Sequence, residues 1–187
     1  QLQNPIATVS QQANVLAQAM AGANRIFEIL DMEGEKDNGY IDLVHATIDK
    51  NGKFHESDTL TGIYAWKKIV NGKAIYKKLE GKIDFEHVNF SYDGKNQILK
   101  DVSFYARPGE KIAFVGSTGA GKTTITNVIT RFYDIDSGSI KVDDIDIKKI
   151  QKQALRRAFG MVLQDVNLFT DSIYENIRYG RLDANDD

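Results

Sequence analysis

The stretch "GSTGAGKTT", residues 116–124, restricts the fold of this 187-residue chain more than any other part of it. It matches the pattern Gly-x-x-x-x-Gly-Lys-[Ser/Thr] at Gly116, Gly121, Lys122 and Thr123. Small residues are needed there because consecutive backbone N–H groups must turn inward around an anion. At average residue frequencies the four fixed positions coincide about once in 30,000 starting points, so chance is a poor explanation.

The sequence on either side of this loop predicts a strand and a helix. The nearly continuous apolar run "KIAFVG" before it predicts a buried strand, and "TTITNVITRFY" after it has the spacing of a helix. The loop therefore leads to a helix N-terminus, where amides without helical partners and the helix dipole favour negative charge. We expect an α/β fold with a P-loop NTPase core.

A nucleotide is the ligand that such a loop predicts. Lys122 would add positive charge at the β- and γ-phosphates, and the Thr123 hydroxyl could bind Mg²⁺. The residues predicted to bind the nucleotide phosphates are Gly116, Ser117, Thr118, Gly119, Ala120, Gly121, Lys122, Thr123 and Thr124.

The charge balance argues against a nucleic-acid partner. The chain carries 24 basic and 26 acidic residues, a net charge of −2, with no long block of like charge. It contains no cysteine, which excludes disulfides and suits a reducing compartment. No stretch reaches the ~18 consecutive apolar residues that a membrane-spanning helix needs, so we expect no such helix within these residues.

The first two regions of the chain differ in pattern. Residues 6–30 carry apolar side chains at spacings of three and four, which predicts a helix with one apolar face that ends in "DMEGE". Residues 34–81 are rich in β-favouring residues, and Asn-Gly-Lys turns at 51–53 and 71–73 predict hairpins of a small antiparallel module. Within it Trp66 is more simply a core residue, although an exposed binding surface is the alternative.

From residue 82 onward strands alternate with helices. "KIDFEHVNFSY" and "LKDVSFYA" predict antiparallel strands, "SGSIKVDD" a further strand and "MVLQ" a second buried strand. "QALRRAFG" and "SIYENI" predict short helices, and Asp143, Asp144 and Asp146 predict a turn. A group of basic residues interleaved with apolar ones is most simply a solvated helix face, with a phosphate-facing or partner-facing role as the alternative: Lys148, Lys149, Lys152, Arg156 and Arg157.

Three segments together resemble one family. "FSYDGKNQILKDVSFYARPGEKIAFVG" resembles the opening of an ABC-type ATP-binding domain, "MVLQDVNLFTDSIYENIRYG" resembles the Q-loop and next helix of the exporter branch, and "RIFEILD" resembles the junction after the last membrane helix. The resemblance implies that Tyr92 stacks on adenine and that Gln164 contacts Mg²⁺ and the attacking water. Lys122 and Gln164 would then be the catalytic residues, Thr123 and Gln164 the Mg²⁺ ligands, and ATP with Mg²⁺ the cofactors. Tyr92 as a strand cap and Gln164 as an ordinary strand-end amide are the alternatives.

The family's later motifs do not occur in this sequence. The Leu-Ser-Gly-Gly-Gln signature, the apolar strand ending in Asp-Glu (Walker B) and the later switch histidine are missing, since His45, His55 and His87 all precede the loop. No carboxylate is thus available as the general base, and we expect ATP binding without turnover. The start at Gln1 and the end at "RLDANDD" also suggest a piece of a longer polypeptide.

The resemblance implies an organisation in three parts. Residues 1–33 would be the C-terminal cytoplasmic helix of the transmembrane domain, 34–81 an inserted β module, and 82–187 the N-terminal part of the ATP-binding domain with its antiparallel β subdomain. The intact protein would be an ATP-hydrolysing exporter at the cytoplasmic face of the cell membrane. It would pair with a second ABC subunit, identical or different, and with its own membrane domain, whose coupling helices would meet "LFTDSIYENI".

Other functions have weaker support. A GTPase would carry an Asn-Lys-x-Asp guanine signal, which is missing, and a P-loop kinase would lack the Tyr92 and Gln164 pattern. A soluble, non-transport ABC ATPase is disfavoured by the helix at 6–30 and by the exporter-like "LFTDSIYENI". A binding module centred on residues 34–81 is a further alternative.

Overall fold

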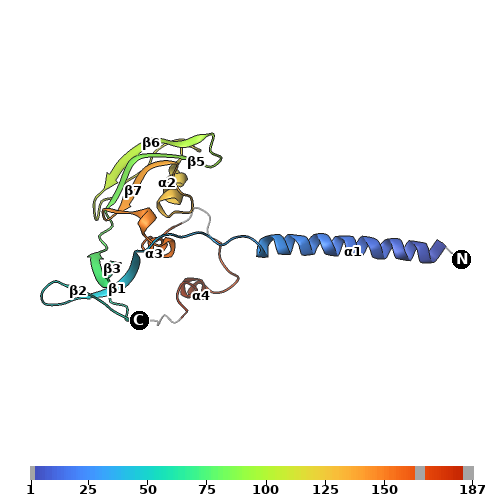
Figure 1. Ribbon diagram of the computed structural model, residues 1–187, viewed down its shortest axis with the longest axis horizontal. Helices are drawn as coiled ribbons and strands as arrows, with labels where there is room; N and C mark the ends of the chain where they lie inside the picture. The colour runs from blue at the N-terminus through green and yellow to red at the C-terminus, as the bar shows by residue number, and fades with distance from the viewer. Residues whose placement is uncertain (1–2, 163–166, 183–187) are drawn as a thin grey trace. The chain divides into compact units, whose positions relative to one another are not determined.

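The computed structural model describes residues 3–162 and 167–182 (Figure 1). Their contacts divide the chain into two compact units, residues 1–37 and 38–187, each considered by itself. The first unit consists mainly of the helix α1, Gln3–Leu30, which confirms the predicted helix. Its apolar side chains from residue 11 onward are largely exposed, Leu16 by 63% and Phe27 by 58%. In the described ranges no helix is both apolar and long enough to cross a membrane.

The second unit begins with a four-stranded antiparallel sheet in the order β2-β1-β3-β4. It is called the inserted sheet here because it lies in the segment predicted above to be an insertion. Both Asn-Gly-Lys segments lie at hairpin turns, as predicted, and Asn71 and Gly72 have φ of 50° and 73°, as a tight two-residue turn requires. The strands are β1 Asp42–Ile48, β2 Phe54–Glu56, β3 Tyr64–Val70 and β4 Lys73–Lys78.

A second four-stranded sheet follows in the order β6-β5-β7-β8, and all its pairs are antiparallel. The Asp143 and Asp144 backbones, with φ of 50° and 62°, form the predicted turn between β7 and β8, whereas Asp146, also predicted for this turn, lies in β8. The strands are β5 Ile83–Ser91, β6 Gln97–Ala106, β7 Ser137–Val142 and β8 Ile145–Asp146. The helices are α2 Lys122–Ile129, the 3-10 turn η1 Ile147–Lys149, α3 Lys152–Arg157 and α4 Ile173–Arg178.

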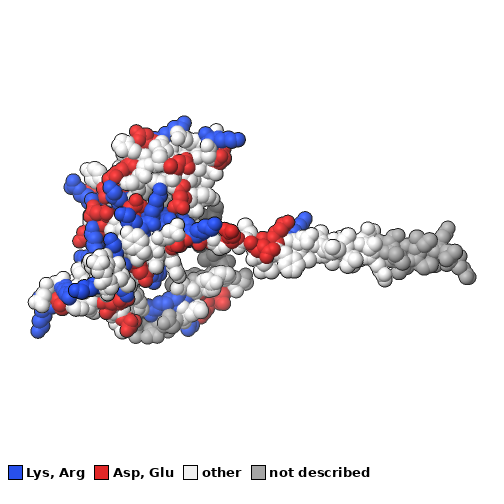
Figure 2. Space-filling model, viewed as in Figure 1, with Lys and Arg blue, Asp and Glu red and all other residues white. Residues whose placement is uncertain are grey.

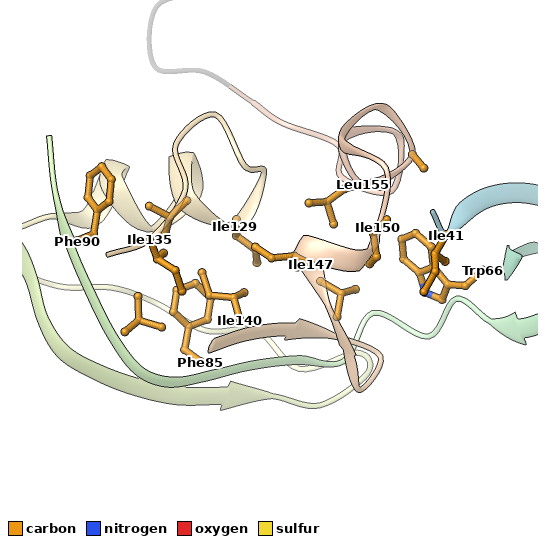
Figure 3. Close-up of a cluster of buried hydrophobic side chains, with 14 of the residues drawn as sticks. Ile41, Trp66, Phe85, Phe90, Ile129, Ile135, Ile140, Ile147, Ile150 and Leu155 are labelled. Atoms are coloured by element: carbon orange, nitrogen blue, oxygen red, sulfur yellow. The ribbon is translucent and has the colours of Figure 1, made fainter. Parts of the chain in front are cut away.

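One hydrophobic core runs through the second unit (Figure 3). The alternation of β5 and β7 turns one row of side chains inward, and this row belongs to the same cluster as buried side chains of α2 and α3. The core continues without a break to Ile41 and Trp66 of the inserted region. The residues labelled in Figure 3 are Ile41, Trp66, Phe85, Phe90, Ile129, Ile135, Ile140, Ile147, Ile150 and Leu155.

Trp66 joins the inserted sheet to the second sheet. Its side chain is 1% exposed, which confirms the core interpretation, and its indole N–H donates to Asp143 Oδ2 at 2.8 Å. Asp143, 2% exposed, also accepts the backbone N–H of Glu80 at 3.1 Å and of Lys82 at 2.9 Å. A buried carboxylate needs such donors, so the β7–β8 turn and the inserted sheet stabilise one another. The core around Trp66 is shared rather than a separate small one.

Backbone contacts strengthen the same joint. The N–H groups of Tyr40 and Ile41 both donate to the carbonyl of Lys149, and the N–H of Gln151 donates to the carbonyl of Ile41 at 2.9 Å. Gly39 lies so close to this strand-like contact that an added Cβ would meet the Ile150 carbonyl oxygen at 2.3 Å. The approach therefore depends on a residue without a side chain.

The prediction of a solvated helix face is wrong for part of α3. Lys152 is only 9% exposed, and Arg156 donates to the carbonyls of Thr130 at 3.2 Å and Arg131 at 2.9 Å. The last carbonyls of a helix lack helical partners, so the end of α2 offers acceptors that draw Arg156 inward. Arg157 also has partners, since it donates to Asp42 Oδ1 at 2.9 Å and to the Leu43 carbonyl.

The predicted buried strand "KIAFVG" is not formed, and residues 161–162, the described half of "MVLQ", lie in no strand. Residues 111–116 belong to no strand and Val115 is 96% exposed, while Val162 is 94% exposed and residues 163–164 lie outside the described ranges. A buried parallel strand needs neighbours that hydrogen-bond along its edges. No such neighbour occurs among the residues that the structure describes.

Candidate functional site

The loop of residues 116–121 folds around the side chain of Lys122. Lys122 Nζ donates to the carbonyls of Gly116 and Ser117, both at 2.7 Å. Gly121 has a φ of 86°, and a Cβ there would lie 3.0 Å from Leu99 Cδ2 on β6. Glycine is required at this position because the backbone is left-handed and the strand passes close behind it.

The helix that follows begins without a side-chain cap. Gly121 is the N-cap of α2 and has no side chain to bond to the amides of the first turn. Such amides, together with the helix dipole, favour an anion. Lys122 is also the first residue of α2, so its ammonium group and the helix N-terminus act at the same place.

A pocket of about 420 Å³ lies against this loop, and Tyr92 lines the same pocket. Its size is that of a ligand-binding cleft. Lys122 is the one charged side chain among the described residues that line it, and the lining holds no carboxylate. The pocket is lined by Tyr92, Ile98, Thr118, Gly119, Gly121, Lys122, Thr123 and Thr124.

This donor set fits a magnesium nucleotide. An ammonium group, a helix N-terminus and hydroxyl groups suit phosphate oxygens, and the exposed Thr123 hydroxyl suits Mg²⁺, which prefers oxygen ligands shared with phosphates. Over the described ranges no group of three or more His, Cys, Asp or Glu side chains could hold a metal ion. Gln164, the second predicted Mg²⁺ ligand, lies outside the described residues.

Tyr92 is held by side chains from two other elements. Its hydroxyl lies 3.2 Å from Thr124 Oγ1 and accepts a hydrogen bond from Asn127 Nδ2 at 3.2 Å. Its ring makes edge-to-face contacts with Phe90 and Tyr133, with ring centres 4.8 Å and 4.9 Å apart. The side chain of Tyr92 remains 49% exposed.

Sequence reasoning missed Asn127 and Tyr133. Asn127 follows Thr124 by three residues on α2 and therefore shares its helix face, so helical spacing could have found it. No sequence signal places Tyr133 beside Tyr92, because the two residues lie on separate elements.

The turn after Tyr92 is closed by Asp93. Its carboxylate accepts the backbone N–H of Asn96 at 2.8 Å and of Lys95 at 2.9 Å. These hydrogen bonds lower the pKa of Asp93 to about 2. The turn that carries Tyr92 between β5 and β6 is therefore built around an ionised side chain.

The segment around α4 exposes apolar side chains. Leu168 is 73% exposed, Phe169 59% and Ile173 81%. Ser172 caps α4 by accepting the N–H of Glu175 at 3.1 Å, which confirms the short helix predicted from "SIYENI". On the face shown in Figure 2, acidic and basic side chains are interspersed over the second unit, while the part of α1 that is not grey presents a mostly uncharged surface.

Comparisons with known proteins point to ABC transporters. Residues 99–187 match the family model described as ABC transporter. The whole chain is 38% identical to 26% of an uncharacterised ABC transporter ATP-binding protein, YfiC, of Bacillus subtilis. Over 57% of the chain, it is 54% identical to 15% of the mitochondrial iron-sulfur clusters transporter ATM1 of Debaryomyces hansenii.

A solved structure of a bacterial Atm1-family ABC exporter with ATP bound is similar to 56% of this chain and 18% of its own, with a TM-score of 0.54 and 43% identity. The present chain spans about a quarter of the length of the curated relatives that it matches over its whole length. Its mixed α/β fold with antiparallel sheets is that of an ABC ATPase domain. The chain thus belongs to the ABC transporter family, and its relatives over the ATP-binding region are ABC exporter ATP-binding/permease proteins.

Proposed function

We propose that this chain is the ATP-binding portion of an ABC exporter subunit and that it binds Mg-ATP in the pocket between Tyr92 and the loop of residues 116–124. The observation that carries the proposal is the pocket itself, which joins an exposed aromatic ring to Lys122 and to the start of α2. An aromatic ring suits a base, and the loop suits phosphates.

Each residue of the site has a proposed role. The amides of residues 116–124 and the Lys122 ammonium group bind the phosphates, Thr123 and Gln164 hold Mg²⁺, and Tyr92 packs on adenine. Bound Mg²⁺ would neutralise charge on the transferred phosphoryl group, and Gln164 would orient the attacking water. Lys122 and Gln164 are thus the proposed catalytic residues of the intact exporter.

We also propose a domain organisation for the chain. Residues 1–33 belong to the membrane domain, 34–81 are an insertion, and 82–187 are the first part of the ATP-binding domain. The exposed apolar side chains around α4 support contact with a membrane domain, because soluble surfaces rarely gather such residues. The intact protein would work at the cytoplasmic face of a membrane with a second ABC subunit.

For these 187 residues, the proposed activity is ATP binding alone. Relatives are named for fatty acids, for iron-sulfur clusters and for lipid A-core, so their names do not point to one transported substrate. The sequence lacks the signature, the Walker B carboxylates and the switch histidine. We therefore infer that these 187 residues bind ATP without turning it over.

Titration of the 187-residue chain with ATP and Mg²⁺ tests the proposal, with calorimetry as the measurement. Lys122→Ala should weaken binding by about tenfold or more, since it removes the one cation among the described residues that line the pocket. Lys100→Ala, on the exposed side of β6, is the matched control and should change nothing. Unchanged affinity in Lys122→Ala would refute the site. Steady-state phosphate release that Lys122→Ala abolishes would refute binding without turnover.

A further inference from the structure

We propose that Asn127 and Tyr133 are positioning residues that hold Tyr92 in place for the base of the bound nucleotide. Neither residue lines the pocket, so each acts through Tyr92 and not on the ligand. The inference rests on the proposed function, because it assumes that the pocket binds a nucleotide.

The hydroxyl of Tyr92 is tied to the helix that carries the loop. Asn127 Nδ2 donates to it at 3.2 Å, and Thr124 Oγ1 lies 3.2 Å from it. Thr124 is 5% exposed, so its side chain has little freedom of its own. The two partners are three residues apart on α2, which places both on the side of the helix that Tyr92 approaches. The distance between the aromatic ring and the loop is thereby set by α2.

The ring of Tyr92 is held independently of its hydroxyl. Phe90 lies at an interplanar angle of 86° and Tyr133 at 88°, the edge-to-face geometry that aromatic rings favour. Phe90 is buried, with 2% exposure, and gives a fixed contact from the core. Tyr133 is 47% exposed and comes from the segment after α2. Tyr92 is therefore contacted by rings from two separate segments.

This arrangement has a consequence for binding. A half-exposed tyrosine that moved among rotamers would lose that freedom when a base packs on it, and the loss would weaken binding. Because Asn127 and Tyr133 already restrict Tyr92, most of this loss is absent. Removing either contact should weaken the binding of a ligand that has a base and leave the binding of phosphates alone unchanged.

The experiment compares two ligands on the 187-residue chain, ATP and inorganic tripolyphosphate, each with Mg²⁺. Tyr133→Leu should weaken ATP binding by roughly three- to tenfold, the range that an edge-to-face contact supplies, and leave tripolyphosphate affinity unchanged. Tyr133→Phe keeps the ring and should retain wild-type affinity for ATP. Asn127→Leu, which keeps the size of the side chain and removes the donor, should also weaken ATP binding selectively.

Phe132→Leu is the matched control, because Phe132 is a neighbouring aromatic residue of similar exposure, 53%, whose ring faces Arg156 instead. It should change the affinity for neither ligand. In a Tyr92→Leu background, Tyr133→Leu should cause no further loss of ATP affinity. That result would show that the effect of Tyr133→Leu depends on Tyr92.

The outcomes separate the two proposals. If Tyr133→Leu weakens both ligands equally, or neither, the positioning role is overturned while the nucleotide site stands. A loss for ATP that persists in the Tyr92→Leu background also overturns the positioning role. If the wild-type chain binds neither ligand, the proposed function fails, and the inference that rests on it fails too. Tripolyphosphate binding by each variant shows that its loop is folded.

Discussion

The joint around Trp66 and the segments that flank the loop of residues 116–121 differ in how completely they are packed. At the joint, Trp66 and Asp143 are 1% and 2% exposed and all the donors and acceptors described above meet partners. Beside the loop, the apolar side chains of Val115 and Val162 are 96% and 94% exposed. Both regions are rich in apolar residues, so composition alone does not explain the difference.

The difference follows from the kind of neighbour that each region needs. At the joint each strand and turn has its partner among the described residues, including Asp143, which lies 77 positions from Trp66. A buried strand of a parallel sheet is completed by strands that are distant in the sequence, and the described residues contain no such partner for residues 111–116. Stability in this chain should therefore depend on the joint and very little on the loop flanks.

The largest expected effect tests that statement directly. Trp66→Ala should lower the free energy of unfolding by about 3–5 kcal/mol, because it opens a cavity in the shared core and leaves Asp143 without its indole donor. Val115→Ala is the matched control and should change it by no more than about 0.5 kcal/mol. Both values come from denaturant unfolding. Equal losses in the two variants would contradict the comparison.

Trp66→Phe sharpens this result. It keeps a smaller aromatic ring in the core, removes the N–H group that donates to Asp143 Oδ2, and leaves a smaller cavity than alanine does. Since the carboxylate would keep the N–H groups of Glu80 and Lys82, we expect a loss of about 1–3 kcal/mol, smaller than that of Trp66→Ala. A loss as large as that of Trp66→Ala would mean that the hydrogen bond, and not the packing, dominates.

A medium effect is expected where the backbone of the inserted region approaches Ile150. Gly39→Ala would place a Cβ 2.3 Å from the Ile150 carbonyl oxygen, so the contact must open, at a cost of about 1–3 kcal/mol in unfolding free energy. Gly34→Ala is the matched control, since nothing lies within 4 Å of its Cβ. If both variants unfold at the same denaturant concentration, the close approach does not contribute to stability.

The smallest effect concerns the ion pairs at the β7–β8 turn. Hydrogen bonds from Lys82 and then Lys77 lower the pKa of Asp144 from 3.8 to about 2. The contribution of these ion pairs to the stability of the folded state is therefore present above pH 3.8, and it is lost as the pH falls from 3.8 to about 2. Asp144→Asn should lower Tm slightly at neutral pH, and the difference from wild type should shrink across that window. A difference that stays constant down to pH 2 would rule out this linkage.

Local patterns predicted much of this fold correctly. The helix at 6–30, the two Asn-Gly-Lys hairpins and the strands β5, β6 and β7 follow from spacing and turn chemistry within a few residues. The predictions failed where the outcome depended on distant neighbours. Residues 111–116 form no strand, since a buried strand needs partners that are distant in the sequence and none of the described strands pairs with them. Arg156 turns inward because the carbonyls at the end of α2 lack helical partners and accept its hydrogen bonds.

In the candidate site, too, the sequence predicted some residues and missed others. Lys122 and the loop glycines are recognisable from the sequence because a phosphate-binding loop needs small residues and a lysine at fixed spacing. Tyr92 came from resemblance to a family, and the pocket of about 420 Å³ now places it against the loop. Asn127 and Tyr133 were missed, since nothing in their own sequence context indicates that they contact Tyr92.

By itself, the sequence determined the residue types of the candidate site, a Gly-rich loop with a lysine and two threonines at its end, and most of the helices and strands. These depend on residue type and short spacing, which the chain carries in every conformation. Only the tertiary structure decided that the inserted sheet shares one core with the second sheet through Trp66 and Asp143, and that Tyr92 is held beside the loop. Those contacts join residues dozens of positions apart, and packing, which depends on shape and burial in three dimensions, selects them.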